Sequence, residues 1–238
     1  MPKVEYRLED RVAVVTLKNG ENRFNPDFIN EYMDVLDWIE NKTDALTLVV
    51  TSGHEKIFSN GIDLDWLLPF IQNKDVNVTK SFFYLLNKLF RKTLNYPLIT
   101  IAAMNGHAFA GGAIWSCAFD FRFMRSDRGF FCLPEADLGI PFLPGMIKLL
   151  RKAIPNHVME EMVYTGIRLT AEQCVEHHIV KEAWHNDQLM ENTLLFAKSL
   201  NKKRVYIKEM RHRMYKDILH ALDVEDIMYI ESERFKLE

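Results

Sequence analysis

The chain of 238 residues contains little cysteine. Its three cysteines, Cys117, Cys132 and Cys174, are odd in number and show no CxxC or Cys/His metal spacing. This pattern argues against a disulfide framework and against a sequence-encoded metal site, and it favours a reducing compartment. We therefore expect buried free thiols, no bound metal and a cytoplasmic location.

The chain also lacks a large excess of either positive or negative residues. The 30 Lys and Arg residues nearly balance the 33 Asp and Glu residues, so the net charge is only -3. No bulk field therefore attracts nucleic acid or an anionic membrane surface. The charged N-terminus, MPKVEYRLEDR, lacks the apolar core of a signal peptide, and no segment approaches the roughly 18 apolar residues of a membrane span. We expect neither nucleic acid nor a membrane as a partner.

Nucleotide-binding signatures are absent as well. The sequence has no GxGxxG and no GxxxxGK[ST], which argues against a dinucleotide or P-loop site. It also has no low-complexity tract and no Gly/Ser linker, and 48% of its residues are apolar. The length and composition fit one large core, or a large core with a small appendage.

The hydrophobic periodicity predicts an α/β fold with a helical C-terminal part. Two β-rich segments, 3–8 and 11–17, suit an antiparallel hairpin. Asn25 and Pro26 predict the cap and first turn of a helix that runs to about residue 41. Further strands are expected at 45–51, 98–103, 121–125 and 129–132, and helices at 63–68, 78–94, 111–118, 144–153, 155–165, 170–177, 187–200, 204–218 and 221–234.

Three segments combine a Gly or Pro turn with an isolated polar group: KIFSNGIDL at 56–64, NGHAFAGGAIW at 105–115 and FFCLPEADLGIPFLPG at 130–145. Gly61 permits a close backbone approach and leaves the Ile62 N–H pointing outward. Gly111 and Gly112 stand where a helix should begin, so their N–H groups could meet an oxyanion. Each glycine feature alone also fits an ordinary turn or close helix packing.

Glu135 lies between Pro134 and Ala136 in apolar company. Such a setting disfavours the charged carboxylate and raises its pKa, as a general base working near neutral pH requires. The alternative is a solvated turn carboxylate. Asp137 is a weaker candidate for a second acid, and His107 is better explained as a structural histidine than as part of a site.

Taken together, ENRFN, FSNGIDL, NGHAFAGGA and LPEADLGIP resemble the motifs of the enoyl-CoA hydratase/isomerase (crotonase) superfamily. The resemblance implies a spiral of ββα units over residues 1–190, holding the coenzyme A (CoA) and active sites. It also implies an α-helical C-terminal region, 191–238, that builds a homotrimer or hexamer. The implied substrate is an acyl-CoA thioester, with no cofactor beyond its CoA moiety.

The resemblance also implies roles for single residues. The N–H groups of Ile62 and Gly111 form an oxyanion hole, and Glu135 is the acid/base. Hydratases of the superfamily carry another glutamate where this chain has Ile114, so the pattern is closest to Δ3,Δ2-enoyl-CoA isomerases. A hydratase, another acyl-CoA lyase or hydrolase, and a non-catalytic acyl-CoA-binding homologue remain as alternatives.

The resemblance further predicts which residues surround the substrate. The CoA contacts would come from the backbone around two loops and the start of the next helix, with Lys56 and Arg23 able to meet phosphates. They are Asn22, Arg23, Phe24, Lys56, Phe58, Ser59, Gly61 and Asp63. Apolar side chains would bound the acyl tail, and these are Trp66, Leu67, Ile114, Trp115, Phe130 and Leu138.

Overall fold

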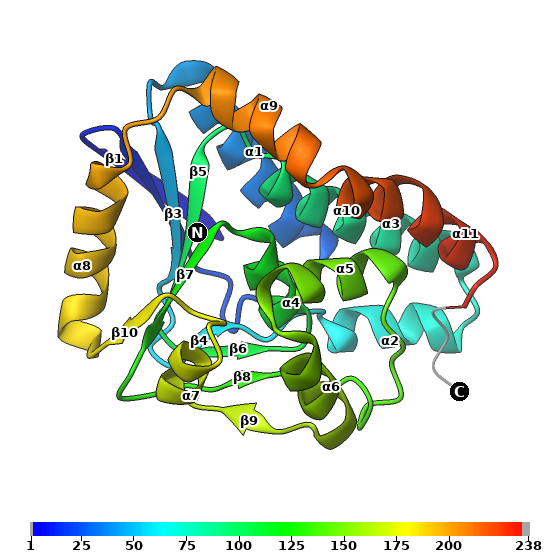
Figure 1. The fold of residues 1–238 in the computed structure, drawn as a ribbon. Coiled ribbons are helices and arrows are strands. Elements are labelled where there is room, and N and C mark those ends of the chain that lie inside the picture. The colour runs from blue at the N-terminus through cyan, green and yellow to red at the C-terminus, as the bar shows by residue number, and fades with distance from the viewer. Residues whose placement is uncertain (1, 235–238) are drawn as a thin grey trace.

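The computed structural model describes residues 2–234 and contains two β-sheets with helices around them (Figure 1). The strands are β1 (Val4–Glu9), β2 (Val12–Leu17), β3 (Thr47–Ser52), β4 (Ile57–Ser59), β5 (Ile99–Met104), β6 (His107–Phe109), β7 (Phe121–Arg125), β8 (Phe131–Cys132), β9 (Arg168–Leu169) and β10 (Glu182–Trp184). The helices are α1 (Pro26–Lys42), α2 (Leu64–Gln72), α3 (Val76–Leu94), α4 (Gly111–Ala118), α5 (Pro144–Ala153), α6 (Asn156–Thr165), α7 (Ala171–Glu176), α8 (Asn186–Ser199), α9 (Arg204–Met214), α10 (Lys216–His220) and α11 (Asp226–Glu231).

The larger sheet has the strand order β1-β2-β3-β5-β7-β10. The hairpin β1–β2 is antiparallel as predicted, and the other neighbours are parallel. Strands β3 and β5 are buried along their whole length, which explains why their sequences are apolar runs without alternation. Helix α8 covers one face of this sheet, and α1, α3 and α4 lie on the other side (Figure 1).

The smaller sheet positions the three sequence motifs. Its order is β4-β6-β8-β9, with β4, β6 and β8 parallel and β9 antiparallel to β8. Gly61 follows β4, Gly111 follows β6, and Glu135 follows β8. The carboxyl ends of parallel strands meet at one edge of a sheet, and ligands bind there in open α/β folds. The motifs therefore converge because they leave neighbouring strands in the same direction.

Several elements differ from the sequence-based prediction. Strands β4, β6, β9 and β10 were not expected, since segments of two or three residues are too short to show a periodicity. The helix expected at 204–218 is divided at Tyr215, and a π-helical turn, Ala221–Glu225, separates α10 from α11. The predicted domain boundary after residue 190 falls within α8. This helix packs on strands β3, β5 and β7 of the larger sheet. The division into 1–190 and 191–238 stays a prediction.

Candidate functional site

A cavity of about 80 Å³ lies at the carboxyl edge of the smaller sheet. Five predicted site residues line it: Ile62, Gly111, Ile114, Glu135 and Leu138. They come from three separate segments and are joined only by the fold. The three predicted catalytic residues are all among them.

The backbone around Gly61 leaves one N–H group outside the local hydrogen bonds. The Phe24 N–H donates to the Gly61 carbonyl at 2.7 Å, and the Asp63 N–H donates to the Phe24 carbonyl at 3.0 Å. These two bonds form one parallel bridge between Phe24 and Ile62, and they use the Gly61 carbonyl and the Asp63 N–H on either side of Ile62. Gly61 has φ +74°, a left-handed conformation that favours glycine. The turn therefore presents the Ile62 N–H without using it.

Gly111 supplies a second N–H group beside the first. It is the first residue of α4, and the first N–H groups of a helix have no acceptor within that helix. A Cβ atom added to Gly61 would lie only 2.5 Å from the Gly111 nitrogen, so these two turns touch. Ala110, just before the helix, has φ 49° and ψ -128°, a strained backbone for a residue other than glycine. The strained residue therefore directly precedes Gly111 and sets the direction of its N–H group.

Glu135 is buried with only 5% of its surface exposed. Its Oε2 atom has no hydrogen-bond partner among the described residues. Burial raises the pKa of Glu135 from 4.5 to about 7, because the charged carboxylate loses its hydration. A carboxyl group with this pKa exchanges a proton readily near neutral pH.

The other groups facing this cavity are almost all apolar. Among the described residues that line it, Glu135 is the only ionisable one, and Asn60 has the only other polar side chain. Ile114, on α4, also lines the cavity, so the position at which the resemblance puts the other glutamate of hydratases carries an apolar side chain. The cavity can therefore offer one proton-transfer group and two N–H donors.

Most of the predicted CoA-binding side chains are buried. Asn22, Phe24, Phe58 and Ser59 have no measurable exposure. The Asn22 side chain donates to the Phe58 carbonyl at 2.9 Å, and the Ser59 hydroxyl donates to the Asn22 carbonyl at 2.8 Å. These side-chain bonds hold the two loops together behind the site, and the CoA contacts expected from the backbone of these four residues stay a prediction.

Apart from the buried Gly61, the other predicted CoA-binding residues lie at the surface or at a helix end. Arg23 is half-buried and paired with Glu21 and Asp65, each with a shortest separation of 2.6 Å. Lys56 is exposed. Asp63 caps α2 by accepting from the Trp66 N–H and also accepts from Asn25, so its carboxylate is already engaged.

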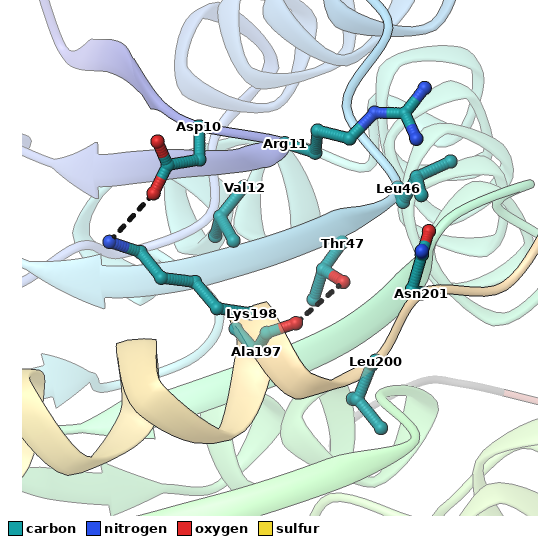
Figure 2. A pocket seen from close by; sticks show the side chains of 9 residues that line it. All are labelled: Asp10, Arg11, Val12, Leu46, Thr47, Ala197, Lys198, Leu200 and Asn201. Carbon is teal, nitrogen blue, oxygen red and sulfur yellow. Dashed lines mark hydrogen bonds and ion pairs between the residues drawn. The ribbon is translucent and has the colours of Figure 1, made fainter.

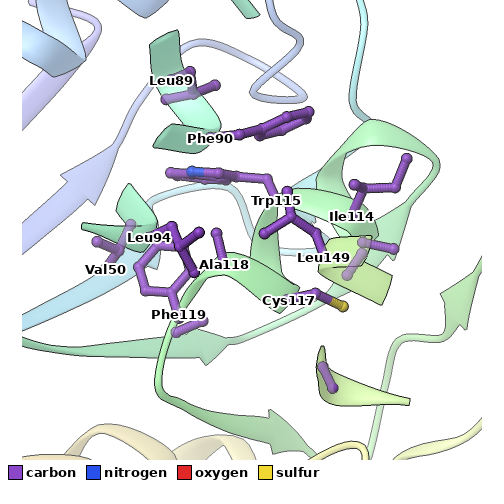
Figure 3. Close-up of a cluster of buried hydrophobic side chains, with 14 of the residues drawn as sticks. Val50, Leu89, Phe90, Leu94, Ile114, Trp115, Cys117, Ala118, Phe119 and Leu149 are labelled. Carbon is purple, nitrogen blue, oxygen red and sulfur yellow. The ribbon is translucent and has the colours of Figure 1, made fainter. Parts of the chain in front are cut away.

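The predicted acyl-pocket residues divide into two groups. Ile114 and Leu138 line the cavity, but Trp66, Leu67, Trp115 and Phe130 do not. Trp115 is instead a centre of the hydrophobic core, packed between α3 and its own helix (Figure 3). Its indole N–H donates to the Thr93 hydroxyl at 2.9 Å. Successive residues of a helix point about 100° apart, so Ile114 can face the cavity while the adjacent Trp115 faces the core.

Phe130 also lies away from the cavity. It stacks on His107 with 5.6 Å between the ring centroids, and its N–H donates to His107 Nδ1 at 3.2 Å. This contact agrees with the structural explanation of His107. Asp137 is exposed and does not line the cavity, so the structure gives no support to a second acid at that position.

The sequence analysis missed several residues that line the cavity: Asn60, Leu64, Phe83, Ala110, Ile140, Pro141, Phe142 and Met146. Four of them follow Glu135 closely in the apolar segment LGIPFLPGM. The combination of Gly and Pro with apolar residues in this segment could have predicted a turn that contributes to the lining of the cavity. Phe83 gave no signal, because its helix α3 is rich in aromatic residues that mostly pack in the core.

A larger cavity, of about 260 Å³, lies elsewhere (Figure 2). It is bounded by the β1–β2 turn, the start of β3 and the end of α8, and it contains none of the predicted site residues. Lys198 Nζ pairs with Asp10 at 2.9 Å across its rim, and Thr47 donates to the Ala197 carbonyl at 3.3 Å. Lys198, Asp10 and Thr47 are therefore engaged with other residues of the lining, unlike Glu135 Oε2 in the smaller cavity.

No helix within residues 2–234 is long and apolar enough to cross a membrane. The same residues form no cluster of three or more His, Cys, Asp or Glu side chains able to hold a metal ion.

The sequence of this chain is similar to those of known enoyl-CoA isomerases and hydratases. The family model described as enoyl-CoA hydratase/isomerase matches residues 7–236. Enoyl-CoA delta isomerase 3 of Arabidopsis thaliana is 31% identical over 214 residues, covering 86% of this chain and 88% of the relative. Short-chain-enoyl-CoA hydratase of Clostridium acetobutylicum is 28% identical over 234 residues, covering 95% and 85%.

A solved structure supports the fold. Human mitochondrial delta3-delta2-enoyl-CoA isomerase superposes with a TM-score of 0.88 at 20% identity, covering 97% of this chain and 90% of the human chain. The predictions of a crotonase fold, of an isomerase-like member of that superfamily and of an enzyme are confirmed. The chain belongs to the enoyl-CoA hydratase/isomerase family.

Proposed function

We propose that this protein shifts the double bond of a 3-enoyl-CoA to give the 2-enoyl-CoA, with Glu135 as its single acid/base. The observation that carries the proposal is the isolation of Glu135. Among the described residues lining the cavity it is the only ionisable group, and Ile114 occupies the position at which the resemblance puts the other glutamate of hydratases. A shuttled proton needs one such group.

In the proposed reaction, the Glu135 carboxylate removes a proton from C2 of the thioester. The electron pair moves into the carbonyl, and the resulting dienolate oxygen accepts hydrogen bonds from the Ile62 and Gly111 N–H groups. The same carboxyl then returns the proton at C4, so the double bond ends between C2 and C3. No water is consumed, and the apolar lining of the cavity disfavours its addition.

The second candidate is hydration of a 2-enoyl-CoA, since one relative is named as a hydratase. That reaction adds water across the double bond, and a bound water usually needs two to four polar partners. Asn60 and Glu135, the only polar side chains among the described lining residues, reach just the lower end of that range, and no second carboxylate is there to activate the water, so the cavity favours isomerisation.

The test is an assay of the purified protein with 3-hexenoyl-CoA and with 2-hexenoyl-CoA. We expect the 3-enoyl ester to give the conjugated product and the 2-enoyl ester to gain no hydroxyl group. Glu135→Gln should lower the isomerase rate by at least 100-fold, while Asp137→Asn, which changes an exposed carboxylate two residues away, should retain it. Wild-type isomerase activity in Glu135→Gln would overturn the mechanism.

Binding of CoA itself is part of the proposal. Lys56 is exposed near β4, and Arg23 is half-buried beside the same loop, so both can reach phosphates at the surface. No cofactor beyond the CoA moiety is required by the proposed proton transfer. A cytoplasmic location is retained as a prediction.

We also propose a homotrimer or hexamer. Tyr206, Met210 and Met214 recur every four residues along α9 and are 64%, 56% and 65% exposed. Such a stripe lies on one side of a helix and is suited to contact another copy of the chain. Light scattering of the wild-type protein and of Met210→Lys would test this, with a smaller mass expected for the variant.

A further inference from the structure

The cavity contains a second unpaired acceptor besides Glu135. The Oδ1 atom of Asn60 is buried and has no hydrogen-bond partner among the described residues, and Asn60 lines the same cavity. A buried carbonyl oxygen without a donor is costly, so such an atom calls for an explanation. Asn60 stands two residues before Ile62, on the loop that carries the proposed oxyanion hole.

The orientation of this amide is held from behind. Asn60 Nδ2 donates to Glu21 Oε2 at 3.1 Å, and the Asn60 N–H donates to the Glu21 carbonyl, also at 3.1 Å. The Glu21 carboxylate accepts from Arg23 Nε at 2.8 Å. A rotated amide would turn Oδ1 against that carboxylate, so Glu21 and Arg23 favour the orientation that leaves the oxygen unpaired.

The position of Asn60 indicates which part of a thioester it meets. The cavity, at about 80 Å³, is far too small to enclose CoA, so most of the substrate must extend outside it. Phe83, Phe142 and Met146 give the cavity an apolar lining suited to the acyl group. Asn60 instead joins the cavity to the partly exposed pair of Glu21 and Arg23.

The chemistry of the substrate then selects the donor. A simple enoyl group has no N–H or O–H. On the other side of the sulfur, two methylene groups lead to the cysteamine amide, whose N–H is the first hydrogen-bond donor of CoA. We propose that Asn60 is a substrate-binding residue whose Oδ1 accepts a hydrogen bond from this amide N–H. This inference rests on the proposed acyl-CoA function. It adds a residue that recognises the CoA side of the thioester, whereas the apolar lining recognises the acyl side.

A direct test compares two truncated thioesters of the same 3-enoyl acid. One carries N-acetylcysteamine, and the other carries the acetate ester of 2-mercaptoethanol, in which oxygen replaces the N–H group. Wild-type protein should prefer the amide by about 10-fold in kcat/KM, since a site that offers an acceptor rejects an analogue without the donor. Asn60→Ala should bring this ratio close to one. The ratio is measured on a single preparation, so a smaller amount of folded protein cancels.

Asn95→Ala is the matched control, because Asn95 also has a buried and unpaired Oδ1 but does not line the cavity. It should keep the wild-type ratio. An unchanged ratio in Asn60→Ala, or a wild-type ratio near one, would overturn the proposal. The dissociation constants of the two saturated thioesters give the same comparison without turnover. If the wild-type protein does not isomerise either thioester but still binds the amide thioester more tightly, the proposed function is refuted and the role of Asn60 stands.

Discussion

Replacing Glu135 by Gln should make the protein more stable at pH 8 while removing its proposed activity. The pKa of Glu135 is raised from 4.5 to about 7 by burial, so folding at high pH must bury a charge that the unfolded chain keeps hydrated. At 1.36 kcal/mol for each factor of ten, the difference corresponds to about 3 kcal/mol. Gln has a similar shape and no charge, so it avoids this penalty.

The sign of the pH dependence follows from proton binding. Between pH 4.5 and about 7 the folded protein holds the Glu135 proton more tightly than the unfolded chain does. Wild-type stability therefore falls as the pH rises through this window and reaches its full loss above about pH 7. The advantage of Glu135→Gln should be near zero at pH 4.5 and grow to about 3 kcal/mol at pH 8.

Urea unfolding at several pH values, followed by circular dichroism, measures this difference. Lys152 and Asp226 are also buried ionisable groups, but they are present in both proteins and cancel in the comparison. Glu161→Gln, at an exposed position of α6, serves as a control and should change the stability by less than about 0.5 kcal/mol. A stability difference that does not vary with pH would refute the assignment of a raised pKa to Glu135.

Three other substitutions test the site and its support. Ile114→Glu should raise the pKa of Glu135 further by like-charge repulsion and lower the isomerase rate at pH 7 by at least 10-fold, and product analysis should detect hydration of a 2-enoyl-CoA. Ala110→Gly should raise the free energy of unfolding by about 1 kcal/mol, since glycine accepts the positive φ without strain, and thermal denaturation would show it. Trp115→Phe should destabilise the protein by about 2 kcal/mol through the lost contact with Thr93 and the lost volume, yet leave the preference for acyl-chain length unchanged in competition assays.

Much of the local structure could be predicted from the sequence, because its causes are local. Asn25 caps α1 by accepting from the Phe28 N–H, as its position before Pro26 predicted. For Glu135 the sequence left a buried base and a solvated turn carboxylate as alternatives, and its 5% exposure in the structure supports the buried one. Short strands such as β4 and β6 could not be found this way, since they exist only by pairing with distant segments.

The roles of single apolar residues were also beyond the sequence. Ile114 and Trp115 are adjacent on α4, yet one faces the cavity and the other the core. Successive helical residues point about 100° apart, and only the surroundings of the helix decide which direction is pocket and which is core. Asn60 illustrates the same limit, because its unpaired oxygen depends on Glu21, which lies 39 residues away in the sequence.

The sequence by itself determined the parts of the site: a glycine turn before Ile62, a helix beginning at Gly111 and a carboxyl group in apolar company. Their chemistry depends on residue type and immediate neighbours, which a sequence records. Only the tertiary structure decided that these parts share one cavity, because their meeting depends on the parallel pairing of β4, β6 and β8. It also decided which side chains bound that cavity, because packing between distant elements sets the direction in which each one faces.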